Sequence, residues 1–222
     1  MNPEEIYTAI TYNKAILSKG AVVVKMICSF FVPCHKGFLC NRFPKSKMLD
    51  FDLIEKTWHM LTGKPSSSST DGLTYTSKHL CFIEAKGWKK FLEYQPELQK
   101  ESTTEPEESR IYQRIKKQNR KYHFQKKLLE SISICEEIIG ENVIVGRIPV
   151  LYILVTDVNP LQDSASLIFQ QLNYLANSSS KWETLCVGEM RKRFEEEIGE
   201  TRGIEARFIQ CKQLDSYLFN PA

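Results

Sequence analysis

The sequence lacks a strong charge imbalance, a long apolar run and regularly paired cysteines. It has 30 Lys or Arg residues against 27 Asp or Glu residues, which gives a formal net charge of +3. Overall charge therefore indicates no polyanionic partner, and a nucleic-acid surface would have to come from the local distribution of charge. The longest apolar stretch, residues 21–32, contains Lys25 and is shorter than the roughly 20 residues that cross a bilayer. A membrane span is not expected.

The cysteines favour a reduced, cytoplasmic protein. The seven cysteines are odd in number and lack paired spacing, and the N-terminus does not resemble a cleavable signal, so a disulfide framework is not expected. Thiolates and imidazole are preferred ligands of zinc, which makes Cys28, Cys34, His35 and Cys40 one alternative site. Their spacing lacks a zinc-binding pattern, so buried free cysteines are the favoured interpretation and a zinc-stabilised interaction module the alternative.

The length and composition fit one domain over residues 1–222. A hydrophobic content of 42% is enough to build a core, and one core can extend to about 250 residues. We expect a helix and strand extension over residues 1–49, a core over about residues 50–157, and further helices and a strand over residues 158–222.

Hydrophobic periodicity predicts alternating helices and strands and therefore an α/β fold. The expected helices cover residues 3–18, 50–61, 109–139, 164–176 and 182–198, and the expected strands cover residues 21–31, 71–76, 79–86, 148–155 and 204–211. The expected loops cover residues 33–44, the serine-rich residues 63–70, and the acidic residues 93–108. We interpret residues 63–70 as a linker or mobile loop.

Two of these strands carry a cluster of charged residues. With Ser77-Lys78 as the turn, antiparallel pairing places Asp71 directly opposite Glu84, with their Cβ atoms about 5 Å apart, where like charges repel. Strand alternation places Lys86 on the same face as Glu84. Two carboxylates suit Mg²⁺ or Mn²⁺, and a bound cation would remove the repulsion. The alternative is a surface hairpin with an ordinary Glu–Lys contact, worth about 0.5 kcal/mol.

The cluster resembles the signature of the PD-(D/E)xK nuclease superfamily, an acidic residue on one strand and Glu-x-Lys on the next. Here the sequence reads Asp71-Gly72 and then Glu84-Ala85-Lys86. The surrounding order of helix, hairpin, long helix and strand is similar to the restriction-endonuclease-like αβββαβ core, a central mixed sheet flanked by helices. The sequence departs from the family in having no proline before Asp71 and little room for the first strand.

The resemblance implies a magnesium-dependent nuclease, more readily acting on DNA, that hydrolyses phosphodiester bonds. Asp71, Glu84 and the Ala85 carbonyl would hold Mg²⁺ or Mn²⁺, and Lys86 would orient or deprotonate the attacking water. A role in restriction or defence fits such a nuclease, and a homodimer would suit twofold-symmetric cutting. The alternative is a catalytically inactive nuclease-fold module that binds nucleic acid or a protein partner.

The family often adds a carboxylate from the helix that precedes the hairpin. Glu55 lies on the predicted helix and is the leading candidate for this catalytic role, while Asp52 and His59 are weaker candidates.

A basic segment lies on the predicted long helix. Residues 110–127 contain eight Lys or Arg and no Asp or Glu, and the cations include Arg110, Arg114, Lys117 and Lys121 at helical spacing. Such a stripe could follow a phosphate backbone or could be a solvated face beside an acidic loop. Where the superfamily often has a polar helix residue near the metal, this chain has Lys121 and Gln125. The candidate nucleic-acid-binding residues are thus Arg114, Lys117, Lys121 and Gln125.

Overall fold

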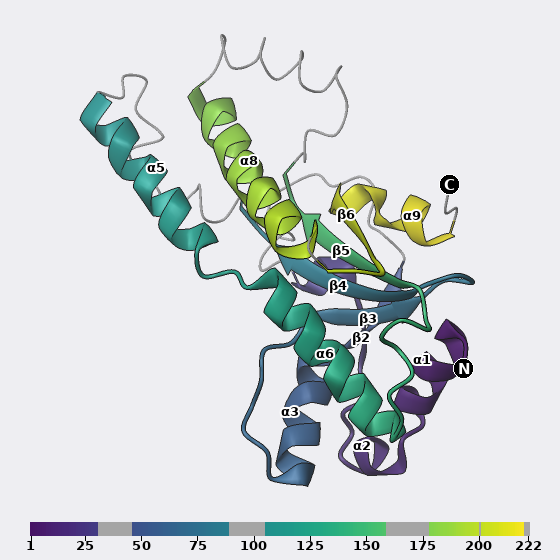
Figure 1. Ribbon diagram of the computed structural model, residues 1–222. Coiled ribbons are helices and arrows are strands. Elements are labelled where there is room, and N and C mark those ends of the chain that lie inside the picture. The colour runs from purple at the N-terminus through teal and green to yellow at the C-terminus, as the bar shows by residue number, and fades with distance from the viewer. Residues whose placement is uncertain (31–45, 89–104, 159–177, 200, 220–222) are drawn as a thin grey trace.

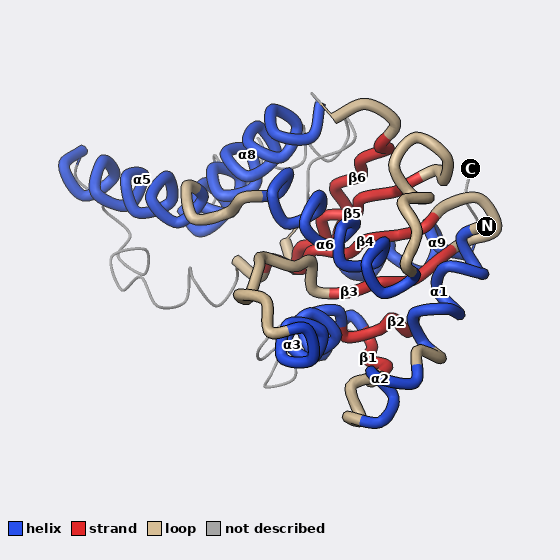
Figure 2. The backbone as a smooth tube through the Cα atoms, turned by 60° about the horizontal axis from the view of Figure 1, so that its bottom comes forward, coloured by secondary structure: helices blue, strands red, loops and turns tan. Residues whose placement is uncertain are grey.

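The fold is an α/β arrangement built on one mixed sheet. It comes from a computed structural model that describes residues 1–30, 46–88, 105–158, 178–199 and 201–219. Six strands form the sheet in the order β1-β2-β3-β4-β5-β6, and helices lie against it (Figure 1, Figure 2). The predicted α/β class with a central mixed sheet flanked by helices is confirmed.

The sheet has an antiparallel half and a parallel half. The strands are β1 (Val24–Met26), β2 (Lys47–Asp50), β3 (Gly72–Tyr75), β4 (Leu80–Lys86), β5 (Val150–Thr156) and β6 (Ile204–Gln210). Neighbours from β1 to β4 pair antiparallel, whereas β4 with β5 and β5 with β6 pair parallel. The carboxyl ends of β4, β5 and β6 therefore lie at one edge of the sheet, a common position for binding sites in open α/β sheets.

Helices come from every part of the described chain. They are α1 (Pro3–Thr11), α2 (Lys14–Ser18), α3 (Phe51–Thr62), α5 (Glu105–Asn119), α6 (Phe124–Ile139), α8 (Ser178–Gly199) and α9 (Leu214–Phe219), with 3-10 turns η1 (Ile27–Phe30) and η3 (Cys211–Gln213). None of them, within the residues described, combines the length and the apolar character that a bilayer span requires.

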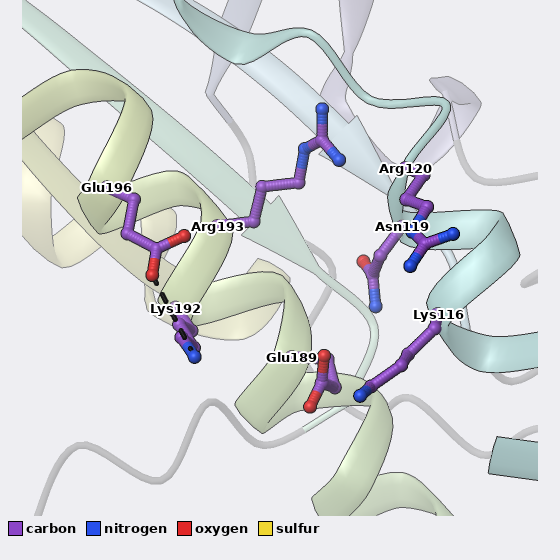
Figure 3. Close-up of a pocket in the computed structure, with 7 residues that line it drawn as sticks. All are labelled: Lys116, Asn119, Arg120, Glu189, Lys192, Arg193 and Glu196. Carbon is purple, nitrogen blue, oxygen red and sulfur yellow. Dashed lines mark ion pairs between the residues drawn. The ribbon is translucent and has the colours of Figure 1, made fainter. Parts of the chain in front are cut away.

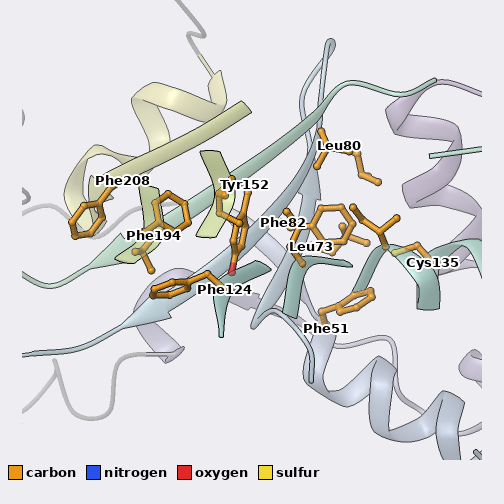
Figure 4. Close-up of a cluster of buried hydrophobic side chains, with 14 of the residues drawn as sticks. Phe51, Leu73, Leu80, Phe82, Phe124, Cys135, Tyr152, Phe194 and Phe208 are labelled. Atoms are coloured by element: carbon orange, nitrogen blue, oxygen red, sulfur yellow. The ribbon is translucent and has the colours of Figure 1, made fainter. Parts of the chain in front are cut away.

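Each face of the sheet buries its own hydrophobic core. On one face, Phe82 of β4 and Tyr152 of β5 pack with apolar residues of α1, α3, α6 and α8 (Figure 4). On the other face, Ile83 and Ile153 pack with residues of η1, η3 and α9. Side chains alternate along β4 between these two cores, as a central strand requires, so Glu84 lies on the α6 side of the sheet.

The β3–β4 hairpin has the predicted register. Leu73 pairs with Phe82 and Gly72 pairs with Ile83, which continues to Asp71 opposite Glu84. The turn at Ser77-Lys78 is closed by a hydrogen bond from the Thr76 amide to the His79 carbonyl, at 2.9 Å. The short turn and the two-residue alternation together fix the register, because a one-residue slip would exchange the two faces.

Several other predicted elements are confirmed. The apolar run at 148–155 forms β5, every residue of which is buried, as expected for a strand covered on both faces. The predictions for residues 50–61, 182–198 and 204–211 correspond to α3, α8 and β6. The predicted loop at 33–44 and helix at 164–176 lie outside the described residues.

Two predicted helices are each divided into two. The predicted helix over 3–18 breaks before α2, where the Asn13 side chain accepts hydrogen bonds from the amides of Ala15 and Ile16. The predicted helix over 109–139 breaks between α5 and α6, where the Lys121 amide bonds to the Gln118 carbonyl in a turn. An asparagine cap explains the first break. The second has neither glycine nor proline, which is why hydrophobic spacing did not reveal it.

The N-terminal strand prediction and the acidic-loop prediction were partly wrong. Of the described residues 21–30, only Val24–Met26 form a strand, and a 3-10 turn follows. The sequence reading missed β2, which pairs with β3 and fills the place of the expected first strand, although it precedes α3. Residues 105–108 belong to α5, whereas residues 89–104 lie outside the described residues. The strands β1, β2 and β6 extend the sheet beyond the expected core of 50–157.

Candidate active site

Asp71 lies immediately before β3 and is tied to β4. Its Oδ2 accepts a 2.6 Å hydrogen bond from the Ala85 amide. The carboxylate of Asp71, just before β3, is thereby fixed beside Ala85, which follows Glu84 on β4. This contact confirms that the two carboxylates share one end of the hairpin, as the register predicted.

Glu84 is completely buried, and its two carboxylate oxygens differ. Oε1 accepts a 2.8 Å hydrogen bond from the Lys127 ammonium on α6 and also forms an ion pair with Lys86. Oε2 is buried without a hydrogen-bond partner among the described residues. A buried carboxylate oxygen without a partner is costly, so Oε2 is an unusual feature of the cluster.

Lys86 lies between the two acids. Its ammonium is 3.8 Å from Asp71 Oδ2 and donates a 3.2 Å hydrogen bond to the Ala85 carbonyl. It also lies 5.3 Å from the centre of the Tyr122 ring, within the range of a cation–π contact. Tyr122 belongs to the turn between α5 and α6, so that turn brings an aromatic ring over the charged cluster.

Burial and mutual repulsion determine the protonation of the cluster. Burial, followed by the charge of Glu84, raises the pKa of Asp71, and the Lys86 and Lys127 ammonium groups only partly offset this. Burial on its own would lower the pKa of Lys86, but the charges of Glu84 and Asp71 outweigh burial and keep that pKa above its ordinary value. Lys86 is therefore a persistent cation at neutral pH in the metal-free chain.

Asp52, rather than Glu55, interacts electrostatically with the cluster. Burial raises the pKa of Asp52, a hydrogen bond from Ser69 opposes this rise, and the charge of Asp71 adds to it. Glu55 is also buried, but its Oε1 accepts 2.8 Å hydrogen bonds from the Ser66 hydroxyl and the Ser67 amide. Glu55 thus holds the chain that leads to Asp71, and a catalytic role for a carboxylate of α3 stays a prediction.

His59 joins Glu55 instead of the cluster. Its Nε2 lies 2.9 Å from the Ser67 hydroxyl and 3.4 Å from Glu55 Oε1. Both residues therefore contact the serine-rich segment.

The serine-rich segment is anchored, which corrects its interpretation as a linker or mobile loop. The Ser68 amide donates to Glu130 of α6, and the Thr70 amide donates to the Ser131 hydroxyl at 2.9 Å. Thr70 is fully buried. Because α3 and α6 both bind this segment, the backbone that enters Asp71 is held on two sides.

Lys127, which the sequence analysis did not single out, is a residue of α6 whose ammonium contacts Glu84. The Gln125 side chain donates to the Thr201 hydroxyl at 3.1 Å, next to the carboxyl end of α8. Lys121 is exposed in the turn before α6. Lys127 lies beside the buried stripe of α6 that includes Leu128 and Ser131. If the helix is taken to begin at Phe124, its helical periodicity places Lys127 next to the buried side of α6.

The remaining candidate nucleic-acid-binding residues are exposed. Arg114 and Lys117 lie on the solvent side of α5, as both a nucleic-acid surface and a solvated helix face would require. Their position therefore leaves both interpretations of the basic stripe open.

The oxygens at this end of the hairpin fit a divalent cation in chemical type. Asp71, Glu84 and the Ala85 carbonyl supply hard oxygen donors, as Mg²⁺ and Mn²⁺ prefer, and Glu84 Oε2 has no competing partner among the described residues. Within the same described parts of the chain, no three His, Cys, Asp or Glu side chains gather closely enough to hold a metal ion by themselves. A cation here would depend on the backbone carbonyl, water and substrate oxygens.

The alternative zinc site is only partly described. Cys28 is buried, whereas Cys34, His35 and Cys40 lie outside the described residues. The zinc interpretation stays a prediction.

The chain matches no protein-family model, curated protein or solved structure. The resemblance to the PD-(D/E)xK superfamily therefore depends on the motif and on the arrangement of its strands and helices.

Proposed function

We propose that this chain is a Mg²⁺- or Mn²⁺-dependent nuclease that hydrolyses phosphodiester bonds of DNA. The observation that carries the proposal is the buried, unpartnered Oε2 of Glu84 at the hairpin end where Asp71 and Lys86 also lie. Structural ion pairs usually satisfy both carboxylate oxygens of a buried acid. An oxygen left without a partner beside a second acid is better explained by a cation that binds during function.

The arrangement of the sheet supports the same proposal. Strands β2, β3 and β4 pair antiparallel, and β5 joins β4 in parallel after α6. This pairing resembles the restriction-endonuclease-like αβββαβ core, in which the acidic residue and Glu-x-Lys occupy neighbouring strands, although here α3 stands between β2 and β3 in the chain. We therefore propose that core as the finer description of the fold.

Asp71, Glu84 and the Ala85 carbonyl would hold the cation. A divalent metal at such a site activates water and neutralises charge on a phosphoryl oxygen. The charge of Asp71 would become fully developed on metal binding, because a nearby cation opposes the burial and repulsion that raise the pKa of this acid.

Lys86 would act as a hydrogen-bond donor and positive charge, rather than as the base. The raised pKa of its ammonium favours the protonated form, which can orient a water and stabilise negative charge on the phosphate. Tyr122 covers this ammonium at 5.3 Å from the ring centre and limits its movement. Lys86 is thus held between the acids and the ring.

A second function is favoured by one specific observation. Lys86 and Lys127 both pair with Glu84, so the cluster can neutralise much of its own charge without a metal. Such a network fits a catalytically inactive module that uses the same scaffold to bind nucleic acid or a protein partner. The two functions differ in whether a divalent cation binds and whether DNA is cut.

Cleavage of plasmid and linear DNA separates these functions. Wild-type protein is incubated with Mg²⁺, Mn²⁺ or EDTA alongside Glu84→Gln and Lys86→Met, and circular dichroism checks that each variant is folded. We expect metal-dependent cleavage by wild type and a loss of about 100-fold or more in both variants, the size typical of removing an electrostatic catalytic group.

Exposed residues of the same types provide matched controls. Glu141 and Lys126 are exposed, and Glu141→Gln and Lys126→Met should retain the wild-type cleavage rate. Equal cleavage with and without EDTA, or an unchanged rate in folded Glu84→Gln, would refute the nuclease proposal. Nucleic-acid binding without any cleavage would instead support the inactive module.

A further inference from the structure

A pocket lies between the end of α5 and the middle of α8, beside the candidate active site. Its volume is about 240 Å³, and its lining residues are Lys116, Asn119, Arg120, Glu189, Lys192, Arg193 and Glu196 (Figure 3). Pockets that enclose drug-sized ligands have volumes of roughly 300–1,000 Å³. This pocket is somewhat smaller, which suits one small polar ligand unit.

Asn119 is the most unusual residue of this pocket. It is only 4% exposed, yet neither its side-chain oxygen nor its side-chain nitrogen has a hydrogen-bond partner among the described residues. Figure 3 shows its amide group extending into the space between the two helices. Buried amides are normally satisfied, so a ligand that offers both an acceptor and a donor would remove this penalty.

The charges around Asn119 favour an anionic part on the same ligand. The lining includes four cationic side chains and two carboxylates. Glu189 accepts a 3.0 Å hydrogen bond from the Tyr112 hydroxyl, and Glu196 lies 3.9 Å from Lys192. Both acids are thus engaged, and so are Lys192 and Arg193, the latter by Glu197 at 2.7 Å. Lys116 and the exposed Arg120 are the lining cations that remain for a ligand. Cationic side chains in such a position suit a phosphate group.

We infer that this pocket binds a nucleotide, with the nucleobase edge on Asn119 and the phosphate near Arg120 and Lys116. An asparagine amide can form paired hydrogen bonds with an adenine edge, which offers an adjacent acceptor and donor. Inorganic phosphate would satisfy the cations but would leave the Asn119 side-chain amide without suitable partners. This inference rests on the proposed function in one respect, since it identifies the nucleotide as part of the substrate strand.

The turn between α5 and α6 connects the pocket to the candidate active site. The Tyr122 amide donates to the Asn119 carbonyl at 3.0 Å, and the Gln118 side chain donates to the Tyr122 hydroxyl at 3.2 Å. The same Tyr122 ring lies over Lys86. A strand whose nucleotide occupies the pocket would therefore pass close to Lys86 and the two acids.

Nuclear magnetic resonance in EDTA tests the site without requiring cleavage. Deoxyadenosine monophosphate, a short single-stranded oligodeoxynucleotide and inorganic phosphate are titrated separately into the isotope-labelled full chain. We expect the first two to shift the Asn119 side-chain amide signals, with tighter binding of the oligodeoxynucleotide. If Asn119 does not respond, or if phosphate binds as tightly as the mononucleotide, the inference is wrong. Tighter binding of the mononucleotide than of the oligodeoxynucleotide would overturn the assignment to a substrate strand.

Variants supply an independent measurement. Asn119→Leu and Arg120→Gln should each weaken oligodeoxynucleotide binding about tenfold or more, as expected when a specific base contact or a phosphate contact is lost. The exposed Arg147 gives the matched control Arg147→Gln, whose affinity should equal that of wild type. Arg120→Gln removes an exposed charge and keeps the test valid if Asn119→Leu fails to fold. Equal affinities in Arg120→Gln and Arg147→Gln would contradict the site.

The failures of the two proposals are distinguishable. Binding that depends on Asn119, with no DNA cleavage under any condition, would retain the pocket and refute the nuclease. Metal-dependent cleavage that depends on Glu84, with no response at Asn119, would retain the nuclease and refute the pocket.

Discussion

The Ala85 amide donates a 2.6 Å hydrogen bond to Asp71 Oδ2, which fixes the first acid of the cluster to the strand of the second. This bond keeps Asp71 close to Glu84 although both are acids. Burial first, and the charge of Glu84 second, raise the pKa of Asp71. The cluster therefore holds two acids together at a cost in free energy.

The pH dependence of stability should reveal this cost. An acid with a raised folded-state pKa contributes stability below its unfolded-state pKa and loses it as pH rises through the folded-state pKa. For Asp71 this loss begins near the ordinary value of 3.8 and continues above it. In EDTA, Asp71→Asn should therefore be more stable than wild type at pH 7, and the difference should shrink as the pH falls toward 4.

Urea unfolding from pH 4 to pH 8 measures this difference. Glu141→Gln, which changes an exposed acid, should show no comparable pH trend. A variant Asp71→Asn that is less stable than wild type at pH 7, or a difference independent of pH, would mean that Lys86 and Lys127 already compensate the Asp71 charge.

The hairpin was predictable because its determinants are local. A two-residue turn at Ser77-Lys78 between two short strand-like runs leaves one antiparallel register for the hairpin. That register places Asp71 opposite Glu84 without any knowledge of the rest of the fold. The strand β5 was predictable from its unbroken apolar run, which is typical of a strand covered on both faces.

The helix side of the site was not predictable, because it depends on contacts that are distant in sequence. The break after Asn119 contains no glycine or proline, and it is stabilised by the inward-facing Tyr122 ring, which packs against Trp88 and Phe124. Treating 109–139 as one helix favoured Lys121 or Gln125 as the helix residue beside the two acids. With α6 beginning separately at Phe124, Lys127 contacts Glu84.

The loop before Asp71 shows a related limit. Serines and a proline over 63–70 are typical of a linker in sequence, yet carboxylates and a hydroxyl from α3 and α6 bind its polar groups. Polar composition does not reveal which partners a loop meets. The contacts of Glu55 with Ser66 and Ser67 could not be predicted from the sequence for this reason.

Lys127 should compete with a divalent cation for Glu84. Lys127→Met removes a 2.8 Å ion pair and leaves Lys86 as the nearby cation, so it should destabilise the metal-free chain by about 1–2 kcal/mol, below the value for an uncompensated buried charge. The same change should tighten Mn²⁺ binding several-fold, because the ammonium no longer has to leave the carboxylate. Calorimetric titration with Mn²⁺ measures the affinity.

The neighbouring lysine is a matched control for this prediction. Lys126 is exposed and lies 3.7 Å from Glu130, so Lys126→Met should leave the Mn²⁺ affinity unchanged. Weaker Mn²⁺ binding in Lys127→Met would show that Lys127 supports the cation site instead of competing with it.

Ser131 should contribute to stability through the anchored loop. Its hydroxyl accepts the buried Thr70 amide at 2.9 Å, so Ser131→Ala leaves a buried donor without its acceptor and should cost about 1–3 kcal/mol. Ser133 on the same helix is exposed, and Ser133→Ala should change stability by less than about 0.5 kcal/mol. Equal denaturation midpoints for the two variants would show that α6 does not hold the loop.

Asp52 should matter more for cleavage than Glu55, and this prediction rests on the proposed nuclease function. Asp52 and Asp71 influence each other electrostatically, so Asp52→Asn changes the charge at the cation site. Glu55→Gln keeps an oxygen that can accept the bonds from Ser66 and Ser67, and it changes charge beside the loop. We expect Asp52→Asn to reduce the metal-dependent cleavage rate at least about tenfold more than Glu55→Gln, a difference of roughly 1.4 kcal/mol in the activation free energy.

Initial rates over a range of Mg²⁺ concentrations provide the comparison, and an additional requirement for Mg²⁺ in Asp52→Asn would place this acid at the cation. The reverse order of rates would return the helix carboxylate to Glu55 and would mean that the loop contacts of Glu55 rearrange when the metal and the substrate bind.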